Sequence, residues 1–165
     1  ARRAGASVIG TSRTPEKLDR AARLGLENAV LADDLWANRV LELTGGKGVD
    51  VILDLVGSPY LEGNQRVIAT QGRHIVVGVP GGSDTTVSLG RLMGKRASIR
   101  GTVLRARPLS EKADLSQAFS EDVLPGFTSG ELEPVVDKVF PAAEAAEAHR
   151  YMEENRNFGK ILLEW

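Results

Sequence analysis

Short apolar runs alternate along most of the chain with segments whose apolar residues recur at helical spacing. The clearest run is residues 49–57 (Val-Asp-Val-Ile-Leu-Asp-Leu-Val-Gly), which consists mainly of β-branched residues and leucine. Such a run is typical of a strand that helices cover on both faces of a parallel sheet. Asp50 and Asp54 lie near the two ends of the run, so we expect only its middle to be buried away from solvent.

The same pattern predicts further strands and helices on both sides of this run. Strands are expected at residues 7–11, 29–32, 49–56, 74–78 and 97–104, and helices at 15–24, 34–44, 60–70 and 88–95. Thr14 is the expected N-cap of the first helix, Gly25 its stop, and Gly72 the stop of the third. Strands that alternate with helices predict an α/β fold, a doubly wound parallel sheet of the Rossmann type.

The last third of the chain has a different pattern. It predicts a long amphipathic helix at residues 111–128, a strand at 135–140, an alanine-rich helix at 142–154 and a final strand at 160–164. We therefore expect a nucleotide-binding domain over residues 1–128 and a helix–strand tail over residues 129–165.

Composition excludes several classes of protein. A formal net charge of −1 gives no support to nucleic-acid or membrane-surface binding, and no apolar run is long enough to cross a membrane. The chain has no cysteine, so it offers neither a disulfide framework nor a thiolate metal site, and we expect a cytoplasmic protein. His74 and His149 stand alone without a spaced acidic partner, so neither is a predicted metal ligand, and no catalytic proton donor is identified.

The first residues indicate a fragment. The chain begins at Ala1 without methionine, and Ala-Arg-Arg-Ala-Gly-Ala is typical of the end of a helix that leads into a strand. A G-x-G-x-x-G loop, which belongs to the first strand–helix turn of a Rossmann unit, is absent. We expect that first strand and its glycine-rich loop to lie upstream.

One candidate binding position follows the first strand of the chain. In NAD-binding sheets the second strand ends in Asp or Glu, which accepts hydrogen bonds from the ribose hydroxyls. At the corresponding place this chain has Ser12 and Arg13, with Lys17 one turn into the next helix. A 2′-phosphorylated ribose needs this reversal, because a carboxylate repels the phosphate and a guanidinium attracts it. The alternative is a solvated Arg and Lys beside a turn.

Two glycine-containing turns form the second candidate. Gly57 follows the strand at 49–56, and Gly78 and Val79 follow the strand at 74–78. Ligands of open α/β sheets bind at the carboxyl ends of the strands, and glycine lets a backbone approach them closely. Either turn by itself is equally explained by a change of chain direction.

A third candidate is the segment after the last strand of the sheet, where Leu104 and Arg105 are followed by a second arginine, Arg107. These arginines could meet a phosphate or a substrate carboxylate. A solvated loop is the alternative.

Three segments carry a resemblance to a known family. They are Ala-Gly-Ala-Ser-Val-Ile-Gly-Thr at 4–11, Leu-Thr-Gly-Gly-Lys-Gly-Val-Asp-Val-Ile-Leu-Asp-Leu-Val-Gly at 43–57, and Ala-His-Arg-Tyr-Met-Glu-Glu-Asn-Arg-Asn-Phe-Gly-Lys-Ile-Leu-Leu at 148–163. The chain resembles the carboxyl-terminal half of the zinc-independent, zeta-crystallin-like NADPH:quinone oxidoreductases of the medium-chain dehydrogenase/reductase superfamily.

The resemblance implies roles for particular residues. Ser12 and Lys17 would face the adenosine 2′-phosphate of NADP(H). Gly78, Val79, Leu104 and Arg105 would lie near the nicotinamide, and Asn157 would lie in a turn that reaches the nucleotide. It also implies that the tail returns to a catalytic domain, and that a homodimer forms by edge-to-edge pairing of strand 97–104.

The chain departs from the family in two respects. Relatives often carry a tyrosine after the third strand of the sheet, where this chain has Ala32 and Asp33. The first strand of the sheet is also missing, so we expect the chain alone to bind NADPH poorly and to be inactive.

The sequence thus predicts an NADPH-dependent oxidoreductase that passes hydride to a quinone or an α,β-unsaturated carbonyl. Two alternatives stay open: a relative of the zinc-dependent alcohol dehydrogenases, whose metal ligands would lie upstream, and a catalytically silent nucleotide-binding or dimerisation module. The physiological substrate cannot be derived from these residues.

Overall fold

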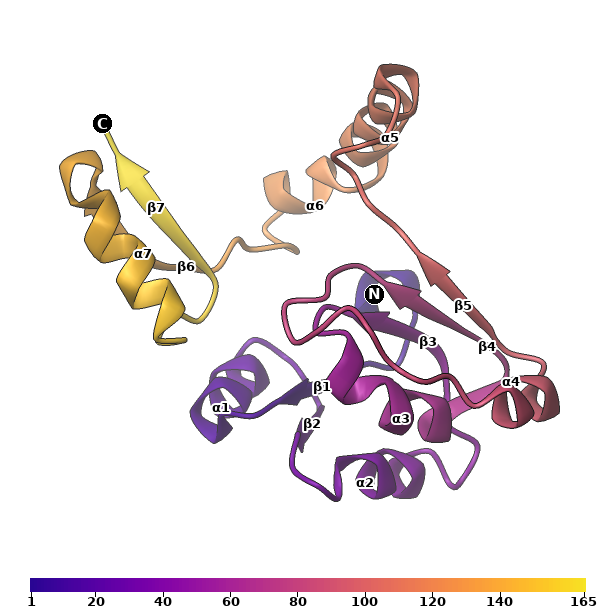
Figure 1. Ribbon diagram of the computed structural model, residues 1–165. Helices are drawn as coiled ribbons and strands as arrows, with labels where there is room; N and C mark the ends of the chain where they lie inside the picture. Colours follow the sequence, from indigo (N-terminus) through magenta and orange to yellow (C-terminus); the bar gives the residue numbers. More distant parts are fainter. The chain divides into compact units, whose positions relative to one another are not determined.

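The computed structural model describes residues 1–165 and divides into two compact units, Ala1–Leu104 and Arg105–Trp165 (Figure 1). The first unit alternates strands and helices. Its elements are η1 (Arg2–Ala4), β1 (Ile9–Ser12), α1 (Pro15–Arg23), β2 (Asn28–Leu31), α2 (Trp36–Leu43), β3 (Val49–Asp54), α3 (Ser58–Val67), β4 (Ile68–Val76), α4 (Leu89–Lys95) and β5 (Ser98–Gly101).

All strand pairs of the first unit are parallel, as the sequence predicts. They form two sheets, β1–β2 and β3–β4–β5, and no strand of the chain pairs with the other edge of β1 or β3. A doubly wound sheet has the strand order 3-2-1-4-5-6. The β1–β2 sheet corresponds to its strands 2 and 3, and the β3–β4–β5 sheet corresponds to its strands 4, 5 and 6. The predicted α/β class is confirmed.

One apolar core lies beneath both sheets. Val30 of β2, Ala37 and Val40 of α2, and Val67 of α3 are buried together, and partly buried residues of β1 and β3 pack against them. Helices α2, α3 and α4 pack side by side in this layer. The core therefore fixes β1 and β3 on the same helical layer although no hydrogen bond joins them.

Strand β3 differs from expectation in its burial. Side chains alternate across a strand. Ile52 and Asp54 face the helices, whereas Val51 and Leu53 stand 45% and 69% exposed on the other face. The prediction of a strand covered on both faces with a wet carboxyl end is wrong for this chain, because only one face has a helical layer and Asp54 is buried beneath it.

The boundaries around β4 also differ. Helix α3 ends at Val67, and Gly72 lies inside β4 rather than stopping a helix. The pairing of β3 with β4 shifts register between Val49 and Val51, and Gln71 opposite this shift has a φ of 63°. A bulge that absorbs extra residues explains why a polar, glycine-containing stretch still belongs to the strand.

The second unit contains α5 (Leu109–Asp122), α6 (Leu124–Thr128), β6 (Val136–Pro141), η2 (Ala142–Glu144), α7 (Ala145–Glu153) and β7 (Lys160–Glu164). The single helix predicted at 111–128 is instead two helices that meet at Val123, since Pro125 lies at the start of α6 and has no N–H for a continuing helix. Strands β6 and β7 pair in parallel, and Phe140 is buried against Tyr151 of α7. The domain division after residue 128 stays a prediction.

No helix of the chain is both long enough and apolar enough to cross a membrane.

Candidate functional site

The turns that follow β3 and β4 are joined by backbone hydrogen bonds. The N–H of Val77 donates to the carbonyl of Asp54 (2.8 Å). The N–H of Ser58 donates to the carbonyl of Gly82 (3.0 Å), and the N–H of Gly81 donates to the carbonyl of Val56 (2.9 Å). We call the two turns, residues 55–58 and 77–82, the double turn. The structure thus brings Gly57, Gly78 and Val79 together at the carboxyl edge of the β3–β4–β5 sheet.

The two predicted glycines of the double turn are needed for different reasons. Gly57 has a φ of 95°, and a Cβ there would lie 2.5 Å from the Gly82 carbonyl oxygen. Packing within the protein therefore accounts for this glycine. A Cβ at Gly78 would meet nothing closer than the Leu55 carbonyl oxygen at 3.6 Å, which is ordinary contact. Packing within the protein therefore does not account for this glycine.

A buried carboxylate holds the double turn from below. Asp54 is 5% exposed, and its Oδ1 accepts hydrogen bonds from the N–H groups of Val56 (2.8 Å) and Gly57 (2.9 Å). Its Oδ2 accepts from Nδ2 of Asn64 (2.9 Å) and lies 3.0 Å from Nε2 of His74. A carboxylate has about four acceptor positions, so each is used.

His74 is only 1% exposed, and the expectation that it stands without an acidic partner is wrong. Since the carboxylate accepts, Nε2 carries the hydrogen, and Nδ1 is buried without a partner. The signal in the sequence was positional: polar residues on neighbouring strands, Asp54 on β3 and His74 on β4, face the same helix. In parallel pairing His74 lies opposite Ile52, two residues before Asp54 and on the same face.

At the carboxyl end of β1, Ser12 has a structural role of its own. Its Oγ accepts from the N–H of Thr14 (3.1 Å), while the Thr14 side chain makes no capping hydrogen bond. Thr14 is the N-cap residue of α1, as the sequence predicts, but its side-chain oxygen makes no capping hydrogen bond, so that part of the prediction is wrong. Arg13 is exposed, and Lys17 lies half-buried in the first turns of α1.

The carboxyl end of β2 lies beside that of β1. Ser12 is opposite Leu31, and the N–H of Ala32 donates to the Ser12 carbonyl (2.8 Å). One residue later, Asp33 accepts a two-pronged contact from Arg39 of α2, with Nη1–Oδ1 at 2.7 Å and Nη2–Oδ2 at 2.6 Å. The Arg39 hydrogen bond lowers the pKa of Asp33 to about 2, with help from the Leu35 N–H. Sequence reasoning noted Asp33 but missed this pair.

The remaining predicted residues lie further along the chain. Leu104 is the exposed last residue of the first unit, and Arg105 and Asn157 belong to the second. The Arg105 carbonyl accepts from Nζ of Lys112 (2.9 Å), and Nδ2 of Asn157 donates to the Gly159 carbonyl (3.0 Å).

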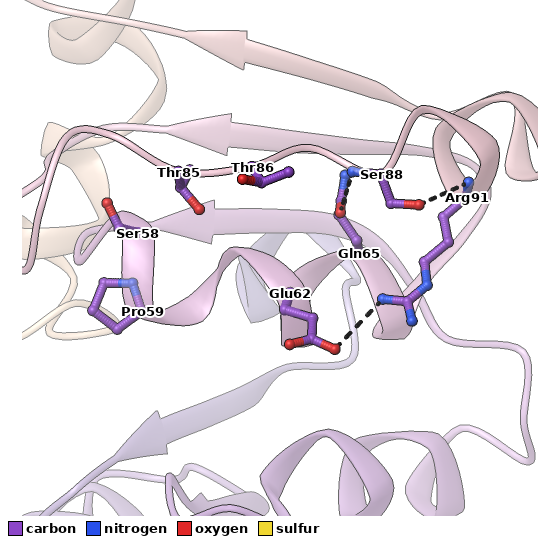
Figure 2. A pocket seen from close by; sticks show the side chains of 8 residues that line it. All are labelled: Ser58, Pro59, Glu62, Gln65, Thr85, Thr86, Ser88 and Arg91. Carbon is purple, nitrogen blue, oxygen red and sulfur yellow. Dashed lines mark hydrogen bonds and ion pairs between the residues drawn. The ribbon is translucent and has the colours of Figure 1, made fainter.

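An open pocket of about 620 Å³ lies between α3 and the segment that leads into α4 (Figure 2). Oε1 of Gln65 accepts from the N–H of Ser88 (3.1 Å), and Arg91 lies 3.9 Å from Glu62 at its rim. None of the predicted site residues lines it. Its lining residues are Ser58, Pro59, Glu62, Gln65, Thr85, Thr86, Ser88 and Arg91.

Metal binding does not fit the side chains of this chain. No group of three or more His, Cys, Asp or Glu side chains is placed to hold a metal ion, and the sequence has no cysteine. The Asp54–His74 pair offers a single carboxylate and a single imidazole, and the carboxylate is fully used by hydrogen bonds.

Comparisons with known proteins agree with this architecture. The family described as zinc-binding dehydrogenase matches residues 24–163. The chain is 32% identical to the 2-haloacrylate reductase of Burkholderia sp. over 99% of its own length and 49% of that protein. It is also 32% identical to the quinone oxidoreductase of Pseudomonas aeruginosa, covering 96% of this chain and 49% of that protein.

Among solved structures, an NAD-dependent alcohol dehydrogenase aligns with a TM-score of 0.83 and 35% identity, over 98% of this chain and 44% of that one. The chain thus spans about half the length of the curated relatives it matches.

Proposed function

The chain belongs to the zinc-binding dehydrogenase family, and from that premise we propose that it binds NADPH for an oxidoreductase that passes hydride to a quinone or an α,β-unsaturated carbonyl. The reductases among its relatives, one named for 2-haloacrylate and one for quinone, support this class of substrate. The nicotinamide supplies the hydride, and the protein's part is to bind and orient the cofactor.

The observation that carries the proposal is the carboxyl end of β1. Ser12 and Arg13 stand where an NAD-binding sheet would have a carboxylate, and Lys17 follows in the first turns of α1. A ribose 2′-phosphate is a dianion that prefers hydroxyl and cationic donors. We assign these three residues to that phosphate.

The double turn and the residues after β5 would serve the other half of the cofactor. Gly78 and Val79, together with Leu104 and Arg105, are proposed to lie near the nicotinamide, and Asn157 near the nucleotide. Packing within the protein does not require a glycine at position 78, which supports a close approach of the cofactor there, whereas Gly57 would act by shaping the turn.

A zinc-dependent alcohol dehydrogenase is the second candidate, favoured by the similarity to an NAD-dependent alcohol dehydrogenase. The side chains of this chain hold no metal site, so any zinc of such an enzyme would need ligands from outside these residues. A homodimer is also proposed: β5 pairs only with β4, and a second copy could satisfy its other edge.

Comparison of NADPH and NADH tests the cofactor. In a protein that joins this chain to the upstream half that its relatives have, we expect oxidation of NADPH with a simple quinone to be preferred over oxidation of NADH, and no oxidation of ethanol with NAD⁺. The double variant Arg13→Gln/Lys17→Gln should lose the preference, while Arg23→Gln, at the other end of α1, should keep it. Equal use of both cofactors by the wild type would refute the assignment of the 2′-phosphate.

A further inference from the structure

Asp33 follows the carboxyl end of β2, which lies beside the β1 end that we assign to the 2′-phosphate. Ser12 and Leu31 lie opposite each other in parallel strands, and the Ala32 N–H donates to the Ser12 carbonyl, so both strands end at the same level. Asp33 is the next residue along the chain. A carboxylate at this edge would repel a 2′-phosphate and favour ribose hydroxyls, which is the preference of an NAD site.

Arg39 compensates this charge by its geometry. The contact is bidentate: Nη1 of Arg39 donates to Oδ1 of Asp33, and Nη2 donates to Oδ2. Nη1 also donates to the Leu31 carbonyl (3.0 Å) at the end of β2. The Leu35 N–H donates to Asp33 Oδ1 as well (2.9 Å). These contacts aim the carboxylate at α2, and the ion pair as a whole is neutral.

We propose that Arg39 is a specificity-determining residue that keeps the site compatible with NADPH by neutralising Asp33. This inference rests on the proposed function and adds a residue on α2, outside the β1 end, to the selection of the cofactor. A lysine cannot reproduce the two-pronged contact, so it would neutralise Asp33 less completely.

Adenosine 2′,5′-bisphosphate and 5′-AMP are suitable probes, since they differ only in the 2′-phosphate. Titration of the ¹⁵N-labelled protein by NMR detects weak binding and gives the affinity ratio of the two. We expect Arg39→Gln to lower the preference for the bisphosphate by about three- to tenfold, because the Asp33 carboxylate would then repel the 2′-phosphate through solvent. The decrease should be smaller at high salt, which screens this repulsion. Arg39→Lys should lie between Arg39→Gln and the wild type. The double variant Asp33→Asn/Arg39→Gln should restore the preference to within about twofold of the wild type.

The outcomes separate this inference from the function on which it rests. A wild type without preference for the bisphosphate overturns the proposed cofactor, and the role of Arg39 with it. A wild-type preference that Arg39→Gln leaves unchanged, or an equal weakening of both ligands, overturns the role of Arg39 alone. Should Arg39→Gln fail to fold, Asp33→Asn decides: it should maintain or raise the preference, and a fall would refute the inference.

Discussion

Asp54 and His74 form a buried pair, with Oδ2 and Nε2 3.0 Å apart and side chains only 3% and 1% exposed. The same carboxylate holds the N–H groups of Val56 and Gly57 in the double turn. A single side chain therefore links the position of a candidate binding loop to the interior of the helical layer.

Replacing Asp54 with alanine should be strongly destabilising. It would leave two backbone N–H groups and the side chains of Asn64 and His74 without their acceptor, so we expect the free energy of unfolding to fall by about 3 kcal/mol. Urea denaturation measures this. Asp50→Ala, at the exposed start of the same strand, is the control and should change stability by less than about 0.5 kcal/mol. Equal effects of the two variants would contradict the role of Asp54.

Alanine at Gly57 and alanine at Gly78 should differ in their effect on the stability of the protein. Gly57→Ala places a Cβ against the Gly82 carbonyl at a φ of 95°, so we expect a loss of about 2 kcal/mol or more in thermal or urea unfolding. Gly78→Ala should leave stability within about 1 kcal/mol, since its Cβ meets no close atom. Under the proposed function, it is Gly78→Ala that should weaken cofactor binding.

Two helical glycines provide a packing test of the same kind. In α3, a Cβ at Gly63 would collide with the Trp36 ring, so Gly63→Ala should destabilise the protein by about 1–3 kcal/mol. In α4, a Cβ at Gly94 would have no atom within 4 Å, so Gly94→Ala should stabilise by about 0.5–1 kcal/mol. A Gly63→Ala variant that melts at or above the wild-type temperature would argue against the packing of α2 on α3.

The Asp33–Arg39 pair predicts a pH dependence. Its hydrogen bonds lower the pKa of Asp33 from 3.8 to about 2. A depressed pKa in the folded protein means that the pair favours folding above pH 3.8, and that this contribution is lost as the pH falls toward 2. NMR titration of the Asp33 side-chain carbonyl carbon should give a midpoint near 2 in the wild type. In Arg39→Gln the midpoint should rise toward 3.8, and an unchanged midpoint would show that Arg39 is not the cause.

Much of the fold was predictable because the information is local. Apolar runs and helical periodicity identified the strands and helices, and Gly25, with a φ of 92°, ends α1 where the sequence places its stop. The final strand, Lys160–Glu164, coincides with its predicted range. Periodicity and turn chemistry depend on neighbouring residues only, so they can be read along the chain.

What only the tertiary structure decided depends on residues far apart in sequence. Asp54 and His74 lie 20 positions apart, and only the parallel register of β3 with β4 puts both beneath the same turn. The same holds for the burial of β3, whose Leu53 is apolar by sequence but exposed because one face of the strand lacks a helical layer. The local sequence pattern indicates which secondary structure a residue favours. The register of strand pairing and the packing of helices on the sheet determine which residues surround it.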